Sequence, residues 1–379
     1  MANTGLEGIV AATTALSHID GERGELIIAG YPLNELAANA TFEETTWLLW
    51  NGELPSSSQL RTFRCSLAAM RAIPEATLAL LRACAQHQVE PMDALRIGAG
   101  TLSLVTDDAA GIVARMPTIV ASYRRYQQGH EPVEPRSDLG HAENFLYMLD
   151  GEVPDSERVR ALETYLNTVV DHGLNASTFT ARVITSTGSD LVSAIGGALG
   201  ALKGPLHGGA PGPALDMVFE IGDASRAEAV LRAKIEAGER LMGFGHRVYK
   251  VRDPRADVLA SAAERLFTRA ADMSLYTLAR SVEAEALRLL EVYKPGRRLQ
   301  TNVEFYTALL LHGLRFDVPL FTPTFAISRV SGWIAHALEQ RQANRIIRPQ
   351  SEYSGPRDRR WVGVTERSDS PMVTRSAAQ

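Results

Sequence analysis

The stretch SERVRALETYLNTVVDHGLN, residues 156–175, sets the fold class of the chain. Its apolar side chains recur at the three- and four-residue spacing of an amphipathic helix, at Val159, Leu162, Tyr165, Leu166 and Val169. The helix is expected to end within 171–175, because glycine and asparagine interrupt helices. His172 therefore stands near a helix junction.

The same periodicity extends in both directions and predicts a mostly α-helical protein. Thr41 and Glu44 form the pattern of a capping box ahead of an apolar helix that 52–55 ends. The one plausible β region is 5–36, where short apolar runs alternate with turn signals. Further helices are expected over 59–72, 75–86, 91–104, 111–128, 176–187, 191–203, 214–221, 224–237, 255–270 and 275–293, from Asn302 onward, and over 325–342.

Three segments interrupt or end this pattern. Residues 129–135 form a polar break, and His130 and His141 are expected on loops or exposed surfaces. The glycines at 196, 197 and 200 follow no strand and lack the spacing of a dinucleotide-binding loop, which excludes that function. The tail after Arg357 is polar and is expected to be irregular.

Length and composition limit the possible functions. A chain of 379 residues exceeds the size at which one core usually stops growing, so two domains are expected. The net charge of −5 argues against nucleic acid as a partner, because phosphate binding usually leaves a basic footprint. Cys65 and Cys84 show no metal-ligand spacing, and we expect ordinary thiols in a reducing compartment.

Targeting and membrane signals are not found. The N-terminal MANTGLEGIVAATT lacks a basic region followed by a long apolar run, and it lacks the Arg-rich pattern of a transit peptide. The most apolar stretch, 191–202, is too short and too rich in glycine to span a bilayer. A cytoplasmic protein without a membrane partner is therefore expected.

The densest chemistry stands in GFGHRVYKVRDPR, residues 243–255. Gly243 and Gly245 can take positive φ, which predicts a tight loop that presents His246. Four cations follow it against the single acid Asp253: Arg247, Lys250, Arg252 and Arg255. Arginine holds carboxylates or phosphates bidentately, and histidine titrates near neutral pH. The pattern indicates a local anion site, and a basic surface turn closed by Asp253 and Pro254 is the alternative.

Four further residues become candidates only as a set. His207 lies in GPLHGGAPGP, 204–213, a turn between two helices that forms the natural domain boundary. Glu304 lies in the first turn of the helix that Asn302 caps, where an acid also favours the helix dipole. Arg329 lies within the helix 325–342, and Arg348 follows it. Taken singly, each is as expected of a surface turn, a helix start or a salt bridge.

Six strings bring these residues together in order: DHGLNASTFTARV, GPLHGGAPGPALDMV, GFGHRVYKVRDPRA, NVEFYTALLLHG, FTPTFAISRVSGWIAHALEQ and NRIIRPQSEYSGP. They resemble the successive signature motifs of citrate synthases, and the N-terminal GLEGIVAATTALSHIDGERGELIIAGYPLNELA resembles that family's opening. The resemblance covers nearly the whole chain. It implies the mainly α citrate synthase fold, with a large helical domain of residues 1–208 and 313–379 and a smaller inserted helical domain of residues 209–312.

The resemblance implies condensation of acetyl-CoA with oxaloacetate and hydrolysis of citryl-CoA to citrate and CoA. Glu304 would remove a proton from the acyl methyl group, His207 would hydrogen-bond the thioester oxygen, and His246 would protonate the carbonyl of oxaloacetate. Glu304 stands where the family most often has aspartate. The substrate carboxylates would be bound by His172, Arg255, Arg329 and Arg348.

It also implies a homodimer in which Arg348 reaches the partner subunit's site. Acetyl-CoA and CoA are then substrate and product, with no permanently bound cofactor and no metal. The basic loop would lie near the CoA phosphates, through Arg247, Lys250 and Arg252. The glycines flanking His207 would let the small domain close over the large one.

Three alternatives remain open. A 2-methylcitrate synthase takes propionyl-CoA, shares these motifs and needs room for one more methyl group, which a hydrophobic pocket discriminates by only about 1–3 kcal/mol. A non-catalytic acyl-CoA-binding homologue would fit the change at Glu304. A metal site of His172, His207 and His246 is the third, although these residues lack the close spacing of a helical zinc motif.

Overall fold

The computed structural model describes residues 5–6, 8–105, 108–208 and 211–367. The described residues between 11 and 347 form one compact unit, and residues 5–6, 8–10 and 348–367 belong to a second. The first unit contains all the candidate site residues except Arg348. The predicted division into domains 1–208 with 313–379 and 209–312 stays a prediction. Residues 209 and 210 of the turn around His207, and residues 368–379 of the polar tail, lie outside the described residues.

A small sheet precedes the helices, as the turn signals predict. Strands β1 (Ser17–Asp20), β2 (Glu25–Ile28) and β3 (Tyr31–Pro32) pair antiparallel in the order β1-β2-β3, with Ser17 opposite Ile28. In β2, Leu26 and Ile28 are buried, whereas Glu25 at the start of the strand is exposed. This alternation is typical of a strand with one face against a core.

The rest of the described chain is mainly helical, which confirms the predicted class. The helices are α1 (Leu33–Asn39), α2 (Phe42–Asn51), α3 (Ser57–Ala69), α4 (Glu75–Gln86), α5 (Pro91–Gly100), α6 (Ala109–Gln127), α7 (His141–Asp150), α8 (Ser156–Val169), α9 (Ala176–Ser186), α10 (Leu191–Leu202), α11 (Pro211–Ile221), α12 (Ala227–Glu236), α13 (Pro254–Arg269), α14 (Ser274–Tyr293), α15 (Val303–Gly313) and α16 (Phe321–Gln342). Short 3-10 turns are η1 (Thr101–Leu104), η2 (Ala224–Arg226), η3 (Val318–Leu320) and η4 (Val364–Glu366).

Helix ends follow the capping chemistry that the sequence indicates. At the start of α2, the Glu44 backbone N donates to Thr41 Oγ1 (3.3 Å), and the Thr41 backbone N donates to Glu44 Oε2 (2.8 Å). This is the predicted capping box. Gly52 ends the helix in the left-handed region, with φ of 82°. Each such cap stabilises a helix by about 1 kcal/mol.

The expectation for His141 is wrong. His130 lies exposed in a loop, but His141 opens α7 and is 2% exposed. Its backbone N donates to Glu43 Oε1 at 2.9 Å, and its ring packs on Phe42 with centroids 4.9 Å apart. Burial, followed by the charge of Arg71, lowers its pKa to about 3. Phe42 and Glu43 are far from His141 in the sequence. The polar residues around His141 therefore gave no indication that it would be buried.

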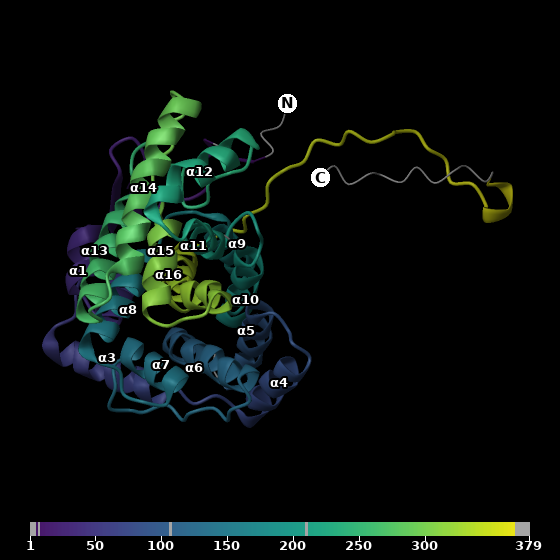
Figure 1. Ribbon diagram of the computed structural model, residues 1–379. Coiled ribbons are helices and arrows are strands. Elements are labelled where there is room, and N and C mark those ends of the chain that lie inside the picture. Colours follow the sequence, from purple (N-terminus) through teal and green to yellow (C-terminus); the bar gives the residue numbers. More distant parts are fainter. Residues whose placement is uncertain (1–4, 7, 106–107, 209–210, 368–379) are drawn as a thin grey trace. The chain divides into compact units, whose positions relative to one another are not determined.

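The core of the first unit lies around α16 (Figure 1), which packs against α2, α5, α6, α8, α9 and α10. Nearly every residue of α16 from Phe321 to Ala337 is buried. A helix that is buried on nearly all sides is expected at the centre of a larger core. Arg329 and His336 are the charged and titratable residues among its buried side chains, which makes them candidates for function.

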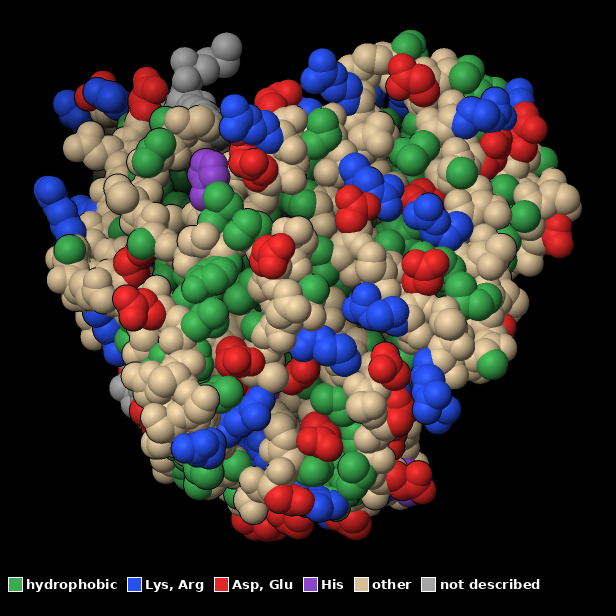
Figure 2. All heavy atoms as spheres, turned by 90° about the vertical axis from the view of Figure 1, so that its left-hand side faces the viewer, with side chains coloured by type: hydrophobic (Ala, Val, Ile, Leu, Met, Phe, Trp, Pro, Cys, Tyr) green, Lys and Arg blue, Asp and Glu red, His purple; other side chains and the backbone are tan. Residues whose placement is uncertain are grey.

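Figure 2 shows one face of the molecule, on which positive and negative side chains are interspersed and separated by neutral and hydrophobic ones. No basic stripe runs over this face. Of the helices that the structure describes, none combines the length and the apolar character that a membrane-spanning helix needs. Cys65 is exposed and Cys84 is buried, and both are free thiols.

Candidate active site

Two segments that are far apart in the sequence pair beside each other at the site. The Gly245 N donates to the Gln300 carbonyl (2.7 Å), and the Asn302 N donates to the Gly243 carbonyl (2.9 Å). Gly243 and Gly245 have φ of 87° and 86°, which confirms the predicted positive values. A Cβ on Gly243 would approach the Phe305 side chain to 2.9 Å. The pairing brings the loop that carries the first candidate histidine next to the start of α15.

His246 leaves this loop half-buried. Its Nδ1 accepts hydrogen bonds from the backbone N of Val248 (3.0 Å) and Tyr249 (3.1 Å). Because a backbone N–H can only donate, these contacts assign the proton of the neutral ring to Nε2. Burial, followed by the charge of Arg255, lowers the pKa of His246 to about 4. Near pH 7 the ring is therefore a neutral N–H donor.

Arg255 is buried beside it and is held by Asp253. Its Nε donates to Asp253 Oδ1 (3.0 Å) and its Nη2 donates to Oδ2 (2.7 Å). Asp253 Oδ2 also accepts from the Val303 N at 3.2 Å, which ties the start of α13 to the start of α15. Nη2 of Arg255 lies 3.2 Å from Nε2 of His246. Since both atoms carry hydrogens, this pair suits one acceptor oxygen of a ligand placed against both.

His172 lies against the same cluster. Its Nε2 is 3.2 Å from the Tyr249 hydroxyl. The ring centroid of His172 is 5.7 Å from that of His246 and 5.7 Å from that of Tyr249. Burial, followed by the charges of Arg255 and Arg329, lowers the pKa of His172 well below its usual range. His172 is thus a second neutral imidazole beside a buried guanidinium.

Glu304 lies in the first turn of α15. Asn302 is the N-cap that the sequence predicts, since its Oδ1 accepts from the Glu304 N at 2.9 Å. Burial raises the pKa of Glu304 to about 7, while Arg255 lowers it and Asp253 raises it. The carboxyl group is therefore within electrostatic range of Arg255. A carboxyl group that titrates near neutral pH is better matched to accept a proton from carbon than one of pKa about 4.3.

Arg329 projects from α16 and is 1% exposed. Its Nε donates to the Val169 carbonyl at 2.7 Å, at the end of α8. Burial lowers its pKa to about 10, so the guanidinium stays charged at neutral pH. Its charge contributes to the lowered pKa of both His172 and His207. Arg329 thus lies in range of two of the three candidate histidines.

His207 is half-buried in its turn and is held by Ser177. Its Nε2 lies 2.8 Å from Ser177 Oγ, which also accepts from Trp333 Nε1 (3.1 Å) and donates to Asn175 Oδ1 (2.8 Å). Burial, followed by Arg329, lowers the pKa of His207 to about 4. With Nε2 turned to Ser177, Nδ1 is the nitrogen that can act on a ligand. While Ser177 donates to Asn175, His207 Nε2 is the donor to Ser177 and Nδ1 has no hydrogen. Nδ1 becomes a donor when the Ser177 proton turns from Asn175 to Nε2.

The other predicted residues lie outside this cluster or in another part of the chain. Arg247 and Lys250 are exposed, and Lys250 Nζ donates to the Arg247 carbonyl (3.2 Å). Arg252 forms ion pairs with Asp257 and with Glu283, the latter at 2.5 Å, so its charge is shared with two carboxylates. Arg348 belongs to the second unit. Their roles at CoA and at a subunit interface stay predictions.

Three residues of the site were not predicted from the sequence. Tyr249 hydrogen-bonds to His172 and packs on the ring of His246. Asp253 accepts hydrogen bonds from Arg255, and Ser177 hydrogen-bonds to His207. An aromatic in the densest loop and an aspartate before proline are signals that could have pointed to Tyr249 and Asp253. Ser177 has no such signal, because its partners are brought to it only by folding.

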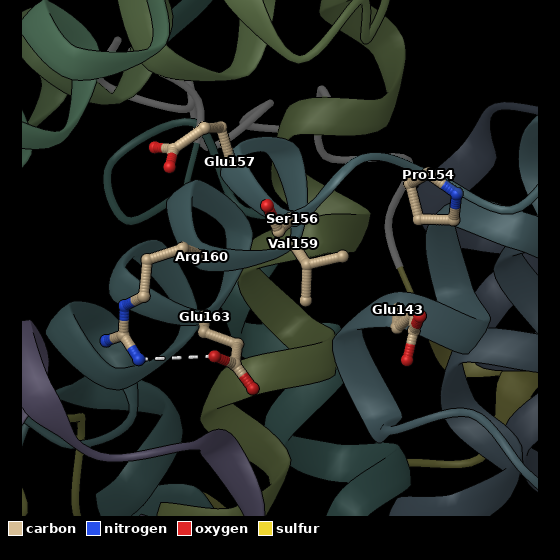
Figure 3. A pocket seen from close by; sticks show the side chains of 7 residues that line it. All are labelled: Glu143, Pro154, Ser156, Glu157, Val159, Arg160 and Glu163. Atoms are coloured by element: carbon tan, nitrogen blue, oxygen red, sulfur yellow. Dashed lines mark hydrogen bonds and ion pairs between the residues drawn. The ribbon is translucent and has the colours of Figure 1, made fainter.

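A hollow of about 550 Å³ lies between α7 and α8 (Figure 3), away from the predicted residues. It is lined by Glu143, Pro154, Ser156, Glu157, Val159, Arg160 and Glu163. Burial, followed by the charge of Glu43, raises the pKa of Glu163 to about 7 even though Arg160 Nη1 donates to it at 3.2 Å. Within the described ranges, no three His, Cys, Asp or Glu side chains gather in a way that could hold a metal ion.

Comparison with known proteins decides the family. The model of the citrate synthase C-terminal domain family matches residues 5–350. The chain belongs to the citrate synthase family. Citrate synthase 2 of Bacillus subtilis (strain 168) is 42% identical over 97% of this chain and 100% of its own length. The 2-methylcitrate synthase of Mycobacterium tuberculosis (strain H37Rv) is 40% identical over 95% of this chain and 92% of its own length.

A solved citrate synthase also has this fold. The citrate synthase of Thermoplasma acidophilum, in a ternary complex with carboxymethyl coenzyme A and oxaloacetate, superposes with a TM-score of 0.87. It is 31% identical, and the match covers 97% of this chain and 100% of that one. The family and the citrate synthase fold indicated by the six motifs are therefore confirmed.

Proposed function

We propose that this member of the citrate synthase family condenses acetyl-CoA with oxaloacetate and hydrolyses the citryl-CoA intermediate to citrate and CoA. The observation that carries the proposal is the cluster of neutral imidazoles and buried guanidinium groups around His246 and Arg255, with a carboxyl group of pKa about 7 in range. These are the groups needed to bind a dicarboxylic keto acid and to remove a proton from an acyl methyl group.

Proton removal from the thioester is the hardest step. The carboxylate of Glu304 takes a proton from the methyl carbon, while His207 hydrogen-bonds the thioester oxygen where negative charge develops. The raised pKa of Glu304, about 7, narrows the gap in acidity between the base and the carbon acid. The enol carbon then attacks the ketone carbon of oxaloacetate, forming the new carbon–carbon bond.

The ketone oxygen gains negative charge in this attack and needs a proton. His246 supplies it from Nε2, the nitrogen that its two backbone contacts leave protonated. His172, Arg255 and Arg329 bind the carboxylates of oxaloacetate, and Arg348 of a second subunit completes the site. Water then adds to the thioester carbonyl of citryl-CoA, and CoA leaves as the thiol.

The assembly follows from these roles. The active form is a homodimer, because Arg348 acts in the partner subunit's site. The inserted domain, 209–312, carries the acyl-CoA and closes on the large domain, and the exposed Arg247 and Lys250 are available for CoA phosphates. Arg252 adds to this positive field while it remains paired with Glu283. No permanently bound cofactor takes part, and the protein acts in the cytoplasm.

A second candidate, 2-methylcitrate synthase, is favoured by one observation. A 2-methylcitrate synthase and a citrate synthase match this chain at 40% and 42% identity, over nearly equal lengths. Propionyl-CoA differs from acetyl-CoA by one methylene group, which a pocket discriminates by about 1–3 kcal/mol. Activity with both substrates is therefore expected. The preferred acyl-CoA then decides between citrate synthase and 2-methylcitrate synthase.

The test measures free CoA released from acetyl-CoA and from propionyl-CoA, each with oxaloacetate. The proposal expects kcat/KM for acetyl-CoA to exceed that for propionyl-CoA. The reverse preference would make the protein a 2-methylcitrate synthase. CoA that binds without release of any thiol would instead support a non-catalytic acyl-CoA-binding homologue.

A further inference from the structure

One face of α16 contacts the end of α8 over three successive positions. Arg329 Nε donates to the carbonyl of Val169 at 2.7 Å. One turn later, Gly332 lies so close that a Cβ there would be 2.3 Å from the carbonyl of Val170. A further turn on, His336 Nε2 lies 3.1 Å from Asp171 Oδ1. The same helix face thus carries a proposed substrate-binding arginine and contacts the residue immediately before His172.

Asp171 is fully buried and holds the turn that presents His172. Its Oδ2 accepts from Ser17 Oγ (2.5 Å) and from the backbone N of Gly173 (3.2 Å). Gly173 has φ of 58°, in the left-handed region, and the chain bends there. Although burial alone would raise the pKa of Asp171, contacts with His336, Arg329 and Ser17 bring it below its usual range. The group is a carboxylate whose two oxygens are held from two sides.

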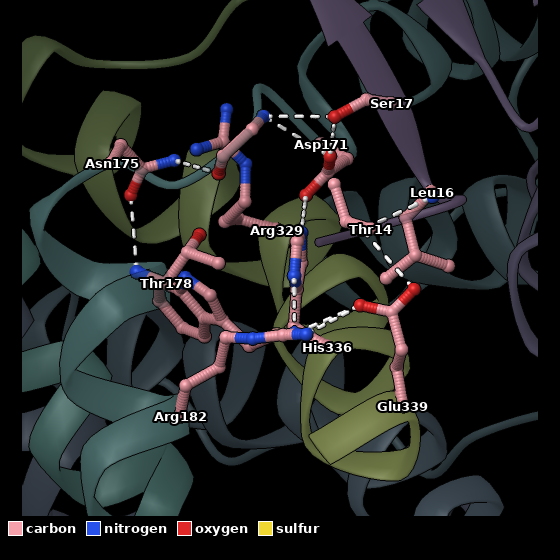
Figure 4. Close-up of polar contacts among 12 residues, drawn as sticks. Thr14, Leu16, Ser17, Asp171, Asn175, Thr178, Arg182, Arg329, His336 and Glu339 are labelled. Atoms are coloured by element: carbon pink, nitrogen blue, oxygen red, sulfur yellow. Dashed lines mark hydrogen bonds and ion pairs between the residues drawn. The ribbon is translucent and has the colours of Figure 1, made fainter. Parts of the chain in front are cut away.

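His336 connects this carboxylate to a second, partly buried ion pair (Figure 4). Its Nδ1 lies 3.5 Å from Nη1 of Arg182, which donates to Glu339 Oε2 at 2.8 Å. Glu339 Oε1 in turn accepts from the Ala15 backbone N at 2.9 Å. Because a guanidinium group can only donate, Nδ1 of His336 is an acceptor and the ring proton stands on Nε2. His336 is therefore oriented to donate to Asp171.

We propose that His336 and Asp171 are positioning residues for oxaloacetate: His336 donates from Nε2 to Asp171, which fixes the turn carrying His172 and leaves Arg329 free for substrate. This inference rests on the proposed function. Neither residue touches substrate, and both act through His172 and Arg329.

The physical reason is competition for Arg329. Asp171 and Arg329 lie within electrostatic range of each other, and each affects the pKa of the other. A carboxylate oxygen that loses its donor in a dry environment must find another or remain unpaired, which is costly. Among the described residues, two cations lie in electrostatic range of Asp171, and Arg182 is already paired with Glu339. Arg329 is therefore the cation left to turn toward Asp171, and a contact there would use the guanidinium that is proposed to bind a substrate carboxylate. His336 prevents this by occupying Asp171 Oδ1.

The test compares two substitutions of one residue. His336→Gln keeps an N–H near the position of Nε2, whereas His336→Asn is too short to donate to Asp171. Calorimetric titration with oxaloacetate should give a Kd raised about tenfold or more in His336→Asn and restored to within about threefold in His336→Gln. The Kd of acetyl-CoA should change less than twofold in both. A tenfold change equals about 1.4 kcal/mol.

Two further variants separate positioning from simple loss of stability. Ser17→Ala removes a contact to Asp171 from outside α16 and should raise the oxaloacetate Kd by about threefold, which keeps the idea testable if His336→Asn does not fold. Thr118→Val removes a buried hydrogen bond to the Arg71 carbonyl (2.8 Å) and should lower the melting temperature without changing either Kd.

The outcomes are distinct. If the variants at His336 and Ser17 lower the melting temperature but bind oxaloacetate as the wild type does, the role is structural and the inference is wrong. An equal loss of oxaloacetate affinity in His336→Gln and His336→Asn also contradicts the inference, because the hydrogen bond donated to Asp171 would then not matter. A wild-type protein that neither binds nor converts oxaloacetate would instead overturn the proposed function.

Discussion

Glu304→Gln should abolish turnover and at the same time stabilise the folded protein above pH 7. The glutamine keeps the shape of the side chain but can neither accept the proton nor carry a charge. Loss of a general base costs about 10²- to 10⁴-fold in rate. The stability gain arises because burial raises the pKa of Glu304 from 4.5 to about 7. This gap corresponds to about 3 kcal/mol, at about 1.36 kcal/mol per pH unit.

The sign follows from proton binding. Between pH 4.5 and about 7 the folded state holds a proton on Glu304 that the unfolded state has released. The stability attached to this proton is complete below pH 4.5 and is lost as the pH rises through about 7. Relative to the wild type, Glu304→Gln should therefore gain about 2–3 kcal/mol at pH 8 and less than about 1 kcal/mol at pH 5.

Urea unfolding at both pH values, together with a CoA-release assay, measures the two effects. Glu163→Gln is the matched control, because burial also raises the pKa of Glu163 to about 7 and this residue lines the hollow of Figure 3. It should become more stable at pH 8 and keep full activity. Turnover by Glu304→Gln above about 1% of the wild-type rate would refute the role of Glu304 as the general base. If only Glu163→Gln gains unfolding free energy at pH 8, burial does not raise the pKa of Glu304 as described.

Four more results are expected. The kcat/KM for acetyl-CoA should rise about tenfold from pH 6 to pH 8, because Glu304 must be ionised and its pKa is about 7; a flat profile contradicts this. Arg329→Lys should raise the oxaloacetate Kd on the order of a hundredfold in calorimetry, since lysine lacks the planar fork, and unchanged binding would place substrate elsewhere. Gly21→Ala should lower kcat/KM about tenfold or more, because its Cβ would stand 2.3 Å from the Val248 carbonyl in the His246 loop, whereas Gly30→Ala, with nothing within 4 Å, should only lower the melting temperature. Exhaustive dialysis against a chelator should leave CoA release unchanged, and a loss restored by zinc would revive a metal site.

Local patterns predicted most of the helices because caps and periodicity are local. The helix over 75–86 is predicted with both ends correct, and Thr41 and Glu44 form the expected capping box. Helix α7 was not predicted, and His141 at its start was expected on a loop or exposed surface. It is instead buried against Phe42 and Glu43, which are about a hundred residues away in the chain. Burial against a distant element overrides the local polarity of the sequence.

In the candidate site, too, local features could be predicted from the sequence and contacts between distant segments could not. The positive φ of Gly243 and Gly245 followed from glycine's freedom and was predictable. The pairing of this loop with 300–302, which sets His246 beside α15, depends on backbone hydrogen bonds across more than fifty residues of chain. No pattern in either segment specifies that register. Motifs could therefore name the chemical groups of the site, whereas only the fold could show which of them touch.

Burial itself distributes the roles within the site. The same dry environment lowers the pKa of His207 and His246 to about 4 and raises that of Glu304 to about 7, but it leaves Arg329 with a pKa of about 10. At neutral pH the imidazoles are then neutral donors, the carboxyl group is poised to exchange a proton, and the guanidinium is still a cation. Substrate carboxylates are thus bound mainly by the charge of arginine, with His172 as a neutral donor, while His207 and His246 remain free to act on carbonyl oxygens. A protonated His246 or His207 would be a second cation able to bind those carboxylates. The neutrality of these two rings therefore helps one pocket to separate carboxylate binding from proton transfer.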